Sequence, residues 1–309
     1  MMEKLNFEFE LNNEQIAERN KLVKQLVVDT NVQAFLKNHQ LDESFVSDNA
    51  SKLNTWLHHL DKCKNCVGLH TCRQAETGYV LGLQLDPLLS FELQACSFQL
   101  DYLKQTEHKS KFSVLDCPEN YLLADVRNLL KAKADSQYIQ SIKELPLWLS
   151  QNQAQGLYIY GGLGVGKTYL AMAILNYFAK QNIKVAFVNV PELAYQFYSS
   201  YTEDDQRAIK LERLRNANVV VFDDIGAETY SSYFRDEVLF PLLNTRMDQK
   251  RMTLFTSNHD FANLAVHFRF NAKGDDESLK SRRLMERIER LAKPLYLAGV
   301  NRRNNENAV

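Results

Sequence analysis

The segment 161–168 reads GGLGVGKT and fits the phosphate-binding pattern G-x-x-x-x-G-K-[ST]. Glycines let the backbone of such a segment curl, so that successive N–H groups point at one anion, and the start of the following helix adds partial positive charge. Lys167 is then able to reach the β- and γ-phosphates of a nucleotide, and the Thr168 hydroxyl to ligate Mg²⁺. A chance match is the alternative, but average glycine usage of about 7% makes it a roughly one-in-a-hundred event in a chain of this length.

Apolar runs on both sides of this segment supply the strand and the helix that it needs. Leu157–Tyr160 is a short apolar run, and a helical pattern extends from Lys167 to about Lys180. Further strands are expected at 185–190, 219–222 and 253–257, with helices between them and an amphipathic helix around 136–150. Strands that alternate with helices predict an α/β domain with a parallel sheet, which we place at 126–309.

Polar side chains follow two of these strands. Asp223 and Asp224 come directly after an apolar run and are expected to hold Mg²⁺ and to orient or deprotonate a water. Two acids that merely cap a strand are the alternative, because Gly226 follows, but the phosphate loop upstream favours the functional interpretation. Asn258 ends the next strand, where the carboxyl ends of parallel strands face the ligand, and is expected to bind water or the γ-phosphate.

The N-terminal third has a different character. Residues 13–60 carry apolar side chains at helical spacing, and the segment 61–100 is rich in cysteine and glycine. Four thiols within it are expected to bind zinc, with His70 as an alternative fourth ligand: Cys63, Cys66, Cys72 and Cys96. Buried apolar cysteines are the alternative. We therefore expect an N-terminal domain with a zinc module at 1–100.

Residues 101–125 are expected to be a linker, because their first half is polar and Pro118 follows. The formal net charge of −1 excludes a strongly basic coat but not a local basic patch. The N-terminus has no apolar signal sequence and no apolar run approaches the roughly 20 residues that span a bilayer, so we expect a cytoplasmic protein without a membrane partner.

The order of the motifs GGLGVGKTYLA, VVVFDDIGAE, FRDEV, TSN, SRRLMERIERLAKP and NRR resembles that of the AAA+ ATPases, and more narrowly that of the bacterial helicase loaders of the DnaI/DnaC type. The resemblance extends over most of 126–309, and the cysteine-rich module is similar to that of the DnaI branch. A departure is Val80, which stands where we associate a ligating histidine with this branch. The resemblance implies a protein that uses ATP to load the hexameric replicative helicase onto single-stranded DNA during primosome assembly.

Several residue roles follow from this resemblance. Arg283 falls at the position of an arginine finger that reaches the ATP of a neighbouring subunit, although Arg282 is adjacent, and Arg302 falls near the sensor-2 arginine. A solvated helix face is the alternative for the first two. The expected contacts of ATP and Mg²⁺ are Gly161, Gly162, Gly164, Val165, Gly166, Lys167, Thr168, Tyr169, Asp223 and Arg302, and the catalytic set is Lys167, Asp223, Asp224, Asn258 and Arg283.

The resemblance implies four kinds of partner: the hexameric helicase, single-stranded DNA, other primosome or initiator proteins, and further copies of the chain in a ring. It also implies that ATP hydrolysis is slow and depends on assembly. Tyr201, Ser231 and Tyr233 are candidate DNA contacts, with ordinary core or surface side chains as the alternative. Two other functions remain open: a transposition helper ATPase and an ATP-binding adaptor without turnover. A replication initiator is disfavoured, because the sequence after residue 280 leaves no room for a separate duplex-binding helix-turn-helix.

Overall fold

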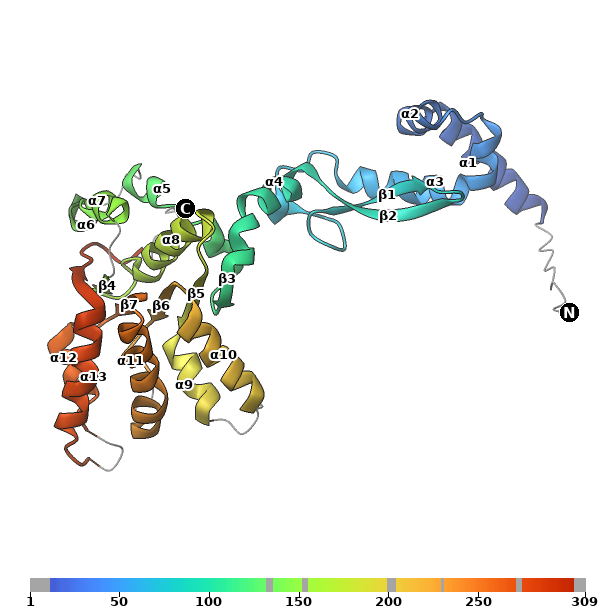
Figure 1. Cartoon of the computed structure of the whole chain (residues 1–309). Coiled ribbons are helices and arrows are strands. Elements are labelled where there is room, and N and C mark those ends of the chain that lie inside the picture. Colours follow the sequence, from blue (N-terminus) through green and yellow to red (C-terminus); the bar gives the residue numbers. More distant parts are fainter. Residues whose placement is uncertain are drawn as a thin grey trace, which may run out of the picture. The chain divides into compact units, whose positions relative to one another are not determined.

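A computed structural model of the chain describes residues 12–131, 136–151, 155–198, 204–228, 231–270 and 274–302 (Figure 1). The chain divides into two compact units, residues 1–104 and residues 105–309, and each is described by itself. No helix within the described ranges is both long and apolar enough to cross a membrane.

The N-terminal unit combines helices with one hairpin. Its elements are α1 (Asn13–Val28), α2 (Thr30–His39), α3 (Ser44–Lys62), the short 3-10 helix η1 (Leu69–Thr71), β1 (Tyr79–Leu85), β2 (Leu89–Ala95) and α4 (Ser97–Gln105). Asn12 and Asp29 cap α1 and α2 by accepting hydrogen bonds from the first-turn amides. The apolar face of the antiparallel hairpin contributes Leu89 to a core with Leu26, Val32 and Leu53.

The C-terminal unit is built around a six-stranded sheet in the order β3-β5-β6-β7-β4-β8, with every pair parallel. The strands are β3 (Phe112–Leu115), β4 (Gly156–Tyr160), β5 (Val185–Asn189), β6 (Val219–Asp223), β7 (Met252–Ser257) and β8 (Ala292–Tyr296). The predicted α/β fold with a parallel sheet is confirmed, and β8 is a strand that the sequence patterns did not indicate.

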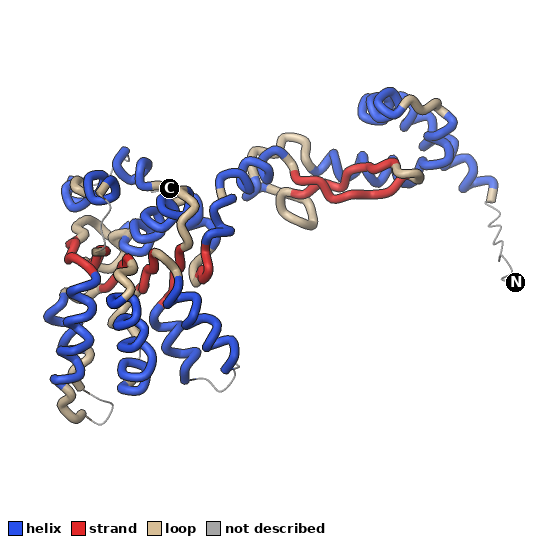
Figure 2. Tube along the Cα trace, viewed as in Figure 1, coloured by secondary structure: helices blue, strands red, loops and turns tan. Residues whose placement is uncertain are grey.

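Helices cover both faces of this sheet (Figures 1 and 2). One face carries η2 (Glu107–Lys111), η3 (Glu119–Leu123), α5 (Val126–Lys131), α6 (Ser136–Ile142), α7 (Leu145–Ser150) and α8 (Lys167–Lys180). The other carries α9 (Val190–Tyr198), α10 (Asp204–Asn216), the π-helix η4 (Phe234–Leu239), α11 (Phe240–Asp248), α12 (Phe261–His267) and α13 (Ser278–Leu291). Each face has its own apolar core, so the sheet is buried on both sides, as parallel sheets are.

The expected linker at 101–125 is wrong. Residues 112–115 form the edge strand β3, which pairs with β5, and the chain on either side packs onto α8. The physical reason is a buried amide: Asn176 of α8 donates to the backbone carbonyls of residues 121, 122 and 124, and its carbonyl oxygen lies 3.1 Å from Nε2 of His108. The C-terminal unit therefore begins near residue 105, and the helix expected at 136–150 is two helices, α6 and α7.

Candidate nucleotide site

The phosphate loop joins β4 to α8 as predicted. Gly164 and Gly166 have φ angles of +74° and +100°, a region that side chains disfavour. Space is also restricted, because a Cβ at Gly164 would lie 1.9 Å from Oδ1 of Asn301. The loop therefore needs glycine at these positions, and α8 begins directly behind it at Lys167.

Lys167 is buried beneath this loop with 6% of its surface exposed. Its ammonium donates to the carbonyls of Gly161 (3.1 Å) and Gly162 (2.8 Å) and to Oδ1 of Asn258 (2.7 Å). A cation held at this loop suits contact with phosphate oxygens. The structure thus brings together two of the predicted site residues, Lys167 and Asn258, from the loop after β4 and the end of β7.

Asp223 ends β6 and is buried, with its carboxylate accepting a hydrogen bond of 2.6 Å from Oγ1 of Thr256. Burial raises the pKa of this carboxyl to about 6, while its hydrogen bonds with Thr256 and Thr168 oppose the shift. Thr256 also accepts from the backbone amide of Asp224, at 2.9 Å. This hydroxyl, which we did not single out from the sequence, therefore fixes the position of both acidic residues.

Asp224 has a left-handed backbone, with φ of +57°, and a side chain that is half-buried. The turn that follows is held to β7, because Oγ of Ser257 donates to the carbonyl of Ile225 at 2.6 Å. The buried carboxylate of Glu228 accepts from the amide of Gly226 at 2.7 Å. The acidic loop is thus rigidly attached to the sheet.

Arg302 lies against the phosphate loop. Its amide donates to the carbonyl of Gly164 at 3.0 Å, and its guanidinium carbon lies 3.9 Å from the ring centre of Tyr138. Within the described chain, its buried Nη2 atom has no hydrogen-bond partner. A guanidinium held at the loop with an unsatisfied nitrogen fits an anionic ligand.

The residues present therefore fit ATP and Mg²⁺. A cationic loop with Lys167 and Arg302 suits a polyphosphate, and Thr168 with the carboxylate of Asp223 supplies the oxygen donors that Mg²⁺ prefers. Tyr169, another predicted contact, is partly exposed and lies edge-on to Tyr121 with ring centres 5.9 Å apart.

Arg282 and Arg283 are exposed on α13. Among the contacts of the described residues, none joins either arginine to the phosphate loop of the same chain. Their helix is amphipathic, and its apolar side, with Leu284, Met285 and Ile288, is buried in the core. The geometry therefore leaves both arginines on the outer surface of the unit.

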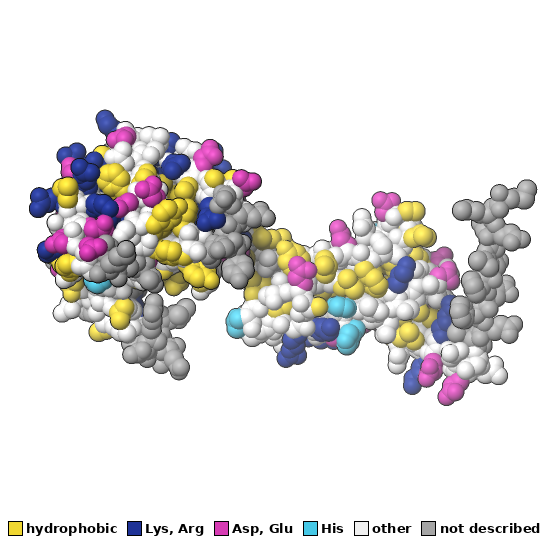
Figure 3. All heavy atoms as spheres, turned by 90° about the horizontal axis from the view of Figure 1, so that it is seen from below, with side chains coloured by type: hydrophobic (Ala, Val, Ile, Leu, Met, Phe, Trp, Pro, Cys, Tyr) yellow, Lys and Arg dark blue, Asp and Glu magenta, His cyan; other side chains and the backbone are white. Residues whose placement is uncertain are grey.

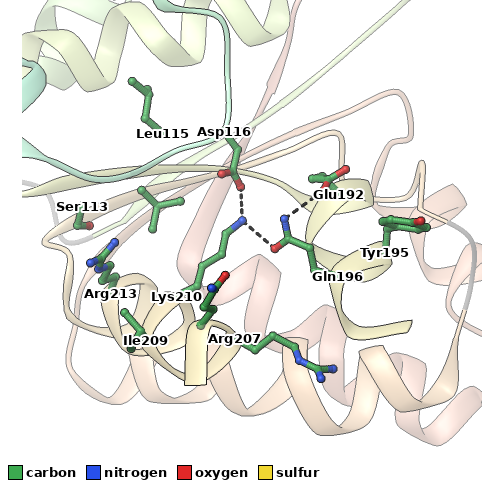
Figure 4. A pocket seen from close by; sticks show the side chains of 12 residues that line it. Ser113, Leu115, Asp116, Glu192, Tyr195, Gln196, Arg207, Ile209, Lys210 and Arg213 are labelled. Atoms are coloured by element: carbon green, nitrogen blue, oxygen red, sulfur yellow. Dashed lines mark hydrogen bonds and ion pairs between the residues drawn. The ribbon is translucent and has the colours of Figure 1, made fainter. Parts of the chain in front are cut away.

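The candidate DNA contacts differ in their surroundings. Tyr201 lies outside the described residues. Oγ of Ser231 accepts from the amide of Phe234 at 3.3 Å, and Tyr233 is 56% exposed. Nearby, a groove of about 740 Å³ runs between β3, α9 and α10 (Figure 4). Lys210 bridges its walls through Asp116 (2.7 Å) and Gln196 (3.0 Å), and the ring of Tyr195 is exposed at its rim.

The predicted zinc ligands are not assembled. No group of three His, Cys, Asp or Glu side chains converges in the described part of the chain. The sulfurs have other partners: Cys63 accepts from the Gln74 amide (3.2 Å), Cys66 donates to the carbonyl of Gly68 (3.5 Å), and Cys72 accepts from the amide of Gly78 (3.4 Å). Thiols that point to their own local partners do not fit a tetrahedral ion as they stand.

Comparisons with known proteins agree with this architecture. The family described as IstB-like ATP binding protein matches residues 89–292, and the family described as primosomal protein DnaI N-terminus matches residues 2–87. The chain is 30% identical to the replicative helicase loader DnaI of Bacillus subtilis over 299 residues, which is 92% of this chain and 93% of that protein.

Two further comparisons cover less of the chain. A crystal structure of DnaI is similar with a TM-score of 0.54 and 34% identity, covering 63% of this chain and 99% of that one. The chromosomal replication initiator DnaA of Leptospira biflexa is 27% identical over 50% of this chain but only 34% of its own length. Since one family match covers most of the chain and the loader from Bacillus subtilis matches nearly all of it, the chain belongs to the IstB-like ATP-binding proteins and, within them, to the replicative helicase loaders of the DnaI type.

Proposed function

We propose that this protein loads the hexameric replicative helicase onto single-stranded DNA in an ATP-dependent step of primosome assembly in the cytoplasm. The proposed binding of ATP is supported by four side chains that lie around one phosphate loop: Lys167, Asp223, Asn258 and Arg302. The loader part is supported by family membership that includes the N-terminal unit.

ATP binding would use the charges of this site. Lys167 and Arg302 would neutralise the phosphate oxygens, and Thr168 and Asp223 would hold Mg²⁺, which supplies further positive charge to the transferred phosphoryl group. Asp224 would accept a proton from, or orient, the attacking water, and Asn258 would hold the same water or the γ-phosphate. Hydrolysis would be slow in the isolated chain, because a second arginine is needed to stabilise the transition state.

That second arginine would be Arg283 of a neighbouring copy. An arginine supplied from outside the subunit makes hydrolysis depend on assembly, because the fork of N–H donors is in place only at a subunit junction. Its exposure on α13 suits this role. We therefore infer that the ATPase units form a ring or an open ring in the complex.

The N-terminal unit would dock onto the helicase. Hydrophobic side chains reach its surface (Figure 3), and those exposed on β2 and α4 include Phe91, Leu93, Phe98 and Leu103. Apolar patches of this kind mark protein interaction sites more often than catalytic ones. Zinc binding by Cys63, Cys66, Cys72 and Cys96 stays a prediction from the sequence, and docking is proposed without it.

Single-stranded DNA would contact the ATPase unit. The groove beside α10 presents Arg207, Lys210 and Arg213 together with the exposed ring of Tyr195, which is the combination of cations and aromatics that binds single strands (Figure 4). Tyr233 is a further candidate because of its exposure.

A gel-filtration experiment with the full chain and the replicative helicase of the same organism tests the proposal. We expect a stable complex in the presence of ATP, and no complex would contradict the loader function. The transposition helper is the second candidate, since the IstB-like match covers the ATPase unit; capture of a transposase instead of the helicase would favour it. Helicase binding without phosphate release under any condition would favour the adaptor.

A further inference from the structure

Arg235 lies at the centre of a charged network that joins the π-helix η4 to the start of α13. Its side chain is 1% exposed. Its guanidinium donates to both carboxylate oxygens of Asp236 (2.6 and 2.8 Å), to Oε2 of Glu277 (2.8 Å) and to the backbone carbonyl of Phe268 (3.0 Å). A single buried arginine therefore holds two segments that are 42 residues apart in the sequence.

Lys280 and Ser232 complete the network. The ammonium of Lys280 lies 2.9 Å from carboxylate oxygens of both Asp236 and Glu277, and Oγ of Ser232 donates to Glu277 at 3.1 Å. We call the five residues Ser232, Arg235, Asp236, Glu277 and Lys280 the η4–α13 cluster. It contains two cations and two carboxylates, so its charges balance.

Stability alone does not explain such a cluster. Burying the guanidinium of Arg235 removes its charge from water, and this loss of solvation offsets most of its attraction to the two carboxylates. What a buried, multiply bonded arginine provides is a single geometry between two elements. The π-helix, a rare element that is frequent at functional sites, points the same way.

Lys280 of the cluster lies about one helical turn before Arg283 on α13. Lys280, Arg283 and Arg287 are three and four residues apart and therefore share one face of the helix. Arg287 is anchored as well, since its Nε donates to Oδ1 of Asn244 at 3.0 Å and its guanidinium carbon lies 5.6 Å from the ring centre of Phe240. Arg283 thus lies between two anchored neighbours, whereas Arg282 is off this face.

We propose that the η4–α13 cluster positions Arg283 for contact with the nucleotide of a neighbouring copy of this chain, with Arg235 and Lys280 as positioning residues. The inference rests on the proposed function, in which Arg283 acts across the subunit junction.

Lys280→Met is the first test, because half of this side chain is exposed and the loss of such an ion pair leaves folding intact. We measure phosphate release by the full chain assembled with the replicative helicase and single-stranded DNA, and ATP affinity by titration with a fluorescent ATP analogue. We expect about a tenfold fall in phosphate release, as for a misplaced catalytic group, with ATP affinity within about twofold of wild type. Lys280→Arg, which keeps both ion pairs, should restore the rate.

Arg290→Met is the matched control. Arg290 is exposed on the same helix and pairs with Glu286 at 2.9 Å, and among the contacts of the described residues none joins its side chain to η4. Its phosphate release should equal that of wild type. Unchanged hydrolysis in Lys280→Met, or an equal fall in Arg290→Met, would overturn the positioning role.

Mixed assemblies separate a role in trans from a structural one. The Lys280→Met variant has an intact nucleotide site, and the Lys167→Ala variant has an intact α13. In a mixture of the two, the rate of ATP hydrolysis should therefore exceed the sum of the rates of the separate variants. Arg283→Ala mixed with Lys167→Ala should recover in the same way. Recovery with Arg283→Ala but not with Lys280→Met overturns the cluster proposal alone, whereas no recovery with Arg283→Ala contradicts the trans arginine of the proposed function itself.

Discussion

The ammonium of Lys167 and Oδ1 of Asn258 lie 2.7 Å apart, although the two residues are separated by 91 positions in the sequence. The contact forms because β4 and β7 are neighbours in the sheet, with Tyr160 opposite Ser257, so the loops that follow the two strands meet. The phosphate-loop cation and the polar residue at the end of β7 therefore belong to one site.

Replacing Lys167 with alanine removes this cation. We expect the affinity for ATP to fall by about 100-fold or more, because a hydrogen bond to a charged group contributes up to about 3 kcal/mol. Lys180→Ala is the control, since Lys180 is on the same helix but exposed at its far end, where it lies 3.5 Å from Asp125. Titration with a fluorescent ATP analogue measures both. Equal affinity in the two variants would remove Lys167 from the nucleotide site.

The pH dependence of Mg²⁺-dependent binding tests Asp223. Burial raises its pKa to about 6, so the carboxylate is mostly ionised at pH 7.5 and mostly protonated at pH 5.5. Since Mg²⁺ and the proton compete for this carboxylate, the gain in ATP affinity that Mg²⁺ provides should weaken by about fourfold between these pH values, the ratio of the ionised fractions. In Asp223→Asn this pH-dependent weakening should vanish, whereas the pH dependence that comes from the ionisation of ATP itself should remain. An identical pH profile in wild type and variant would exclude Asp223 as a ligand.

Asn176→Ala should destabilise the C-terminal unit. The variant leaves three buried carbonyls and the ring nitrogen of His108 without their partner, and we expect a loss of about 3 kcal/mol in the free energy of unfolding. Asn216→Ala, at an exposed position, should change it by less than about 0.5 kcal/mol. Urea unfolding followed by circular dichroism compares the two, and equal stabilities would show that residues 105–124 are not held by α8.

Cys63→Ser separates docking from ATP binding. If the four thiols hold zinc, we expect weaker helicase binding in gel filtration, because the metal would then stabilise the N-terminal unit. The affinity for ATP should be unchanged in either case, because the substitution lies outside the C-terminal unit. Metal analysis of the purified wild-type chain should find one zinc per chain if the prediction from the sequence holds. A chain without zinc would reject the metal site and leave the sulfurs in their local hydrogen bonds.

The nucleotide site was predictable from the sequence because its requirements are local. A loop with left-handed glycines, a lysine at the start of a helix and acids at the end of an apolar strand are readable without knowing the fold. The roles expected for Arg302 and Arg283 came from the family resemblance, because arginines have many uses and nothing in the local sequence distinguishes these two.

The rest depends on contacts between distant segments. The stretch before β3 is polar and linker-like, and the four-residue run Phe112–Leu115 is too short to stand out as a strand until β5 offers an edge to pair with. Hydrogen bonds between distant residues likewise join Arg235 to Glu277 and Thr256 to Asp223. The spacing of the cysteines in the sequence does not determine where their sulfurs point.

The loading reaction itself is the most direct test of the account. The replicative helicase is incubated with a covalently closed circle of single-stranded DNA, which only an opened ring can enter, and the circle-bound helicase is measured after gel filtration. We predict that wild-type protein with ATP increases the helicase bound to circles by at least about tenfold, and that Lys167→Ala does not. No increase with the wild-type protein, or an equal increase with Lys167→Ala, would contradict an ATP-dependent helicase loader.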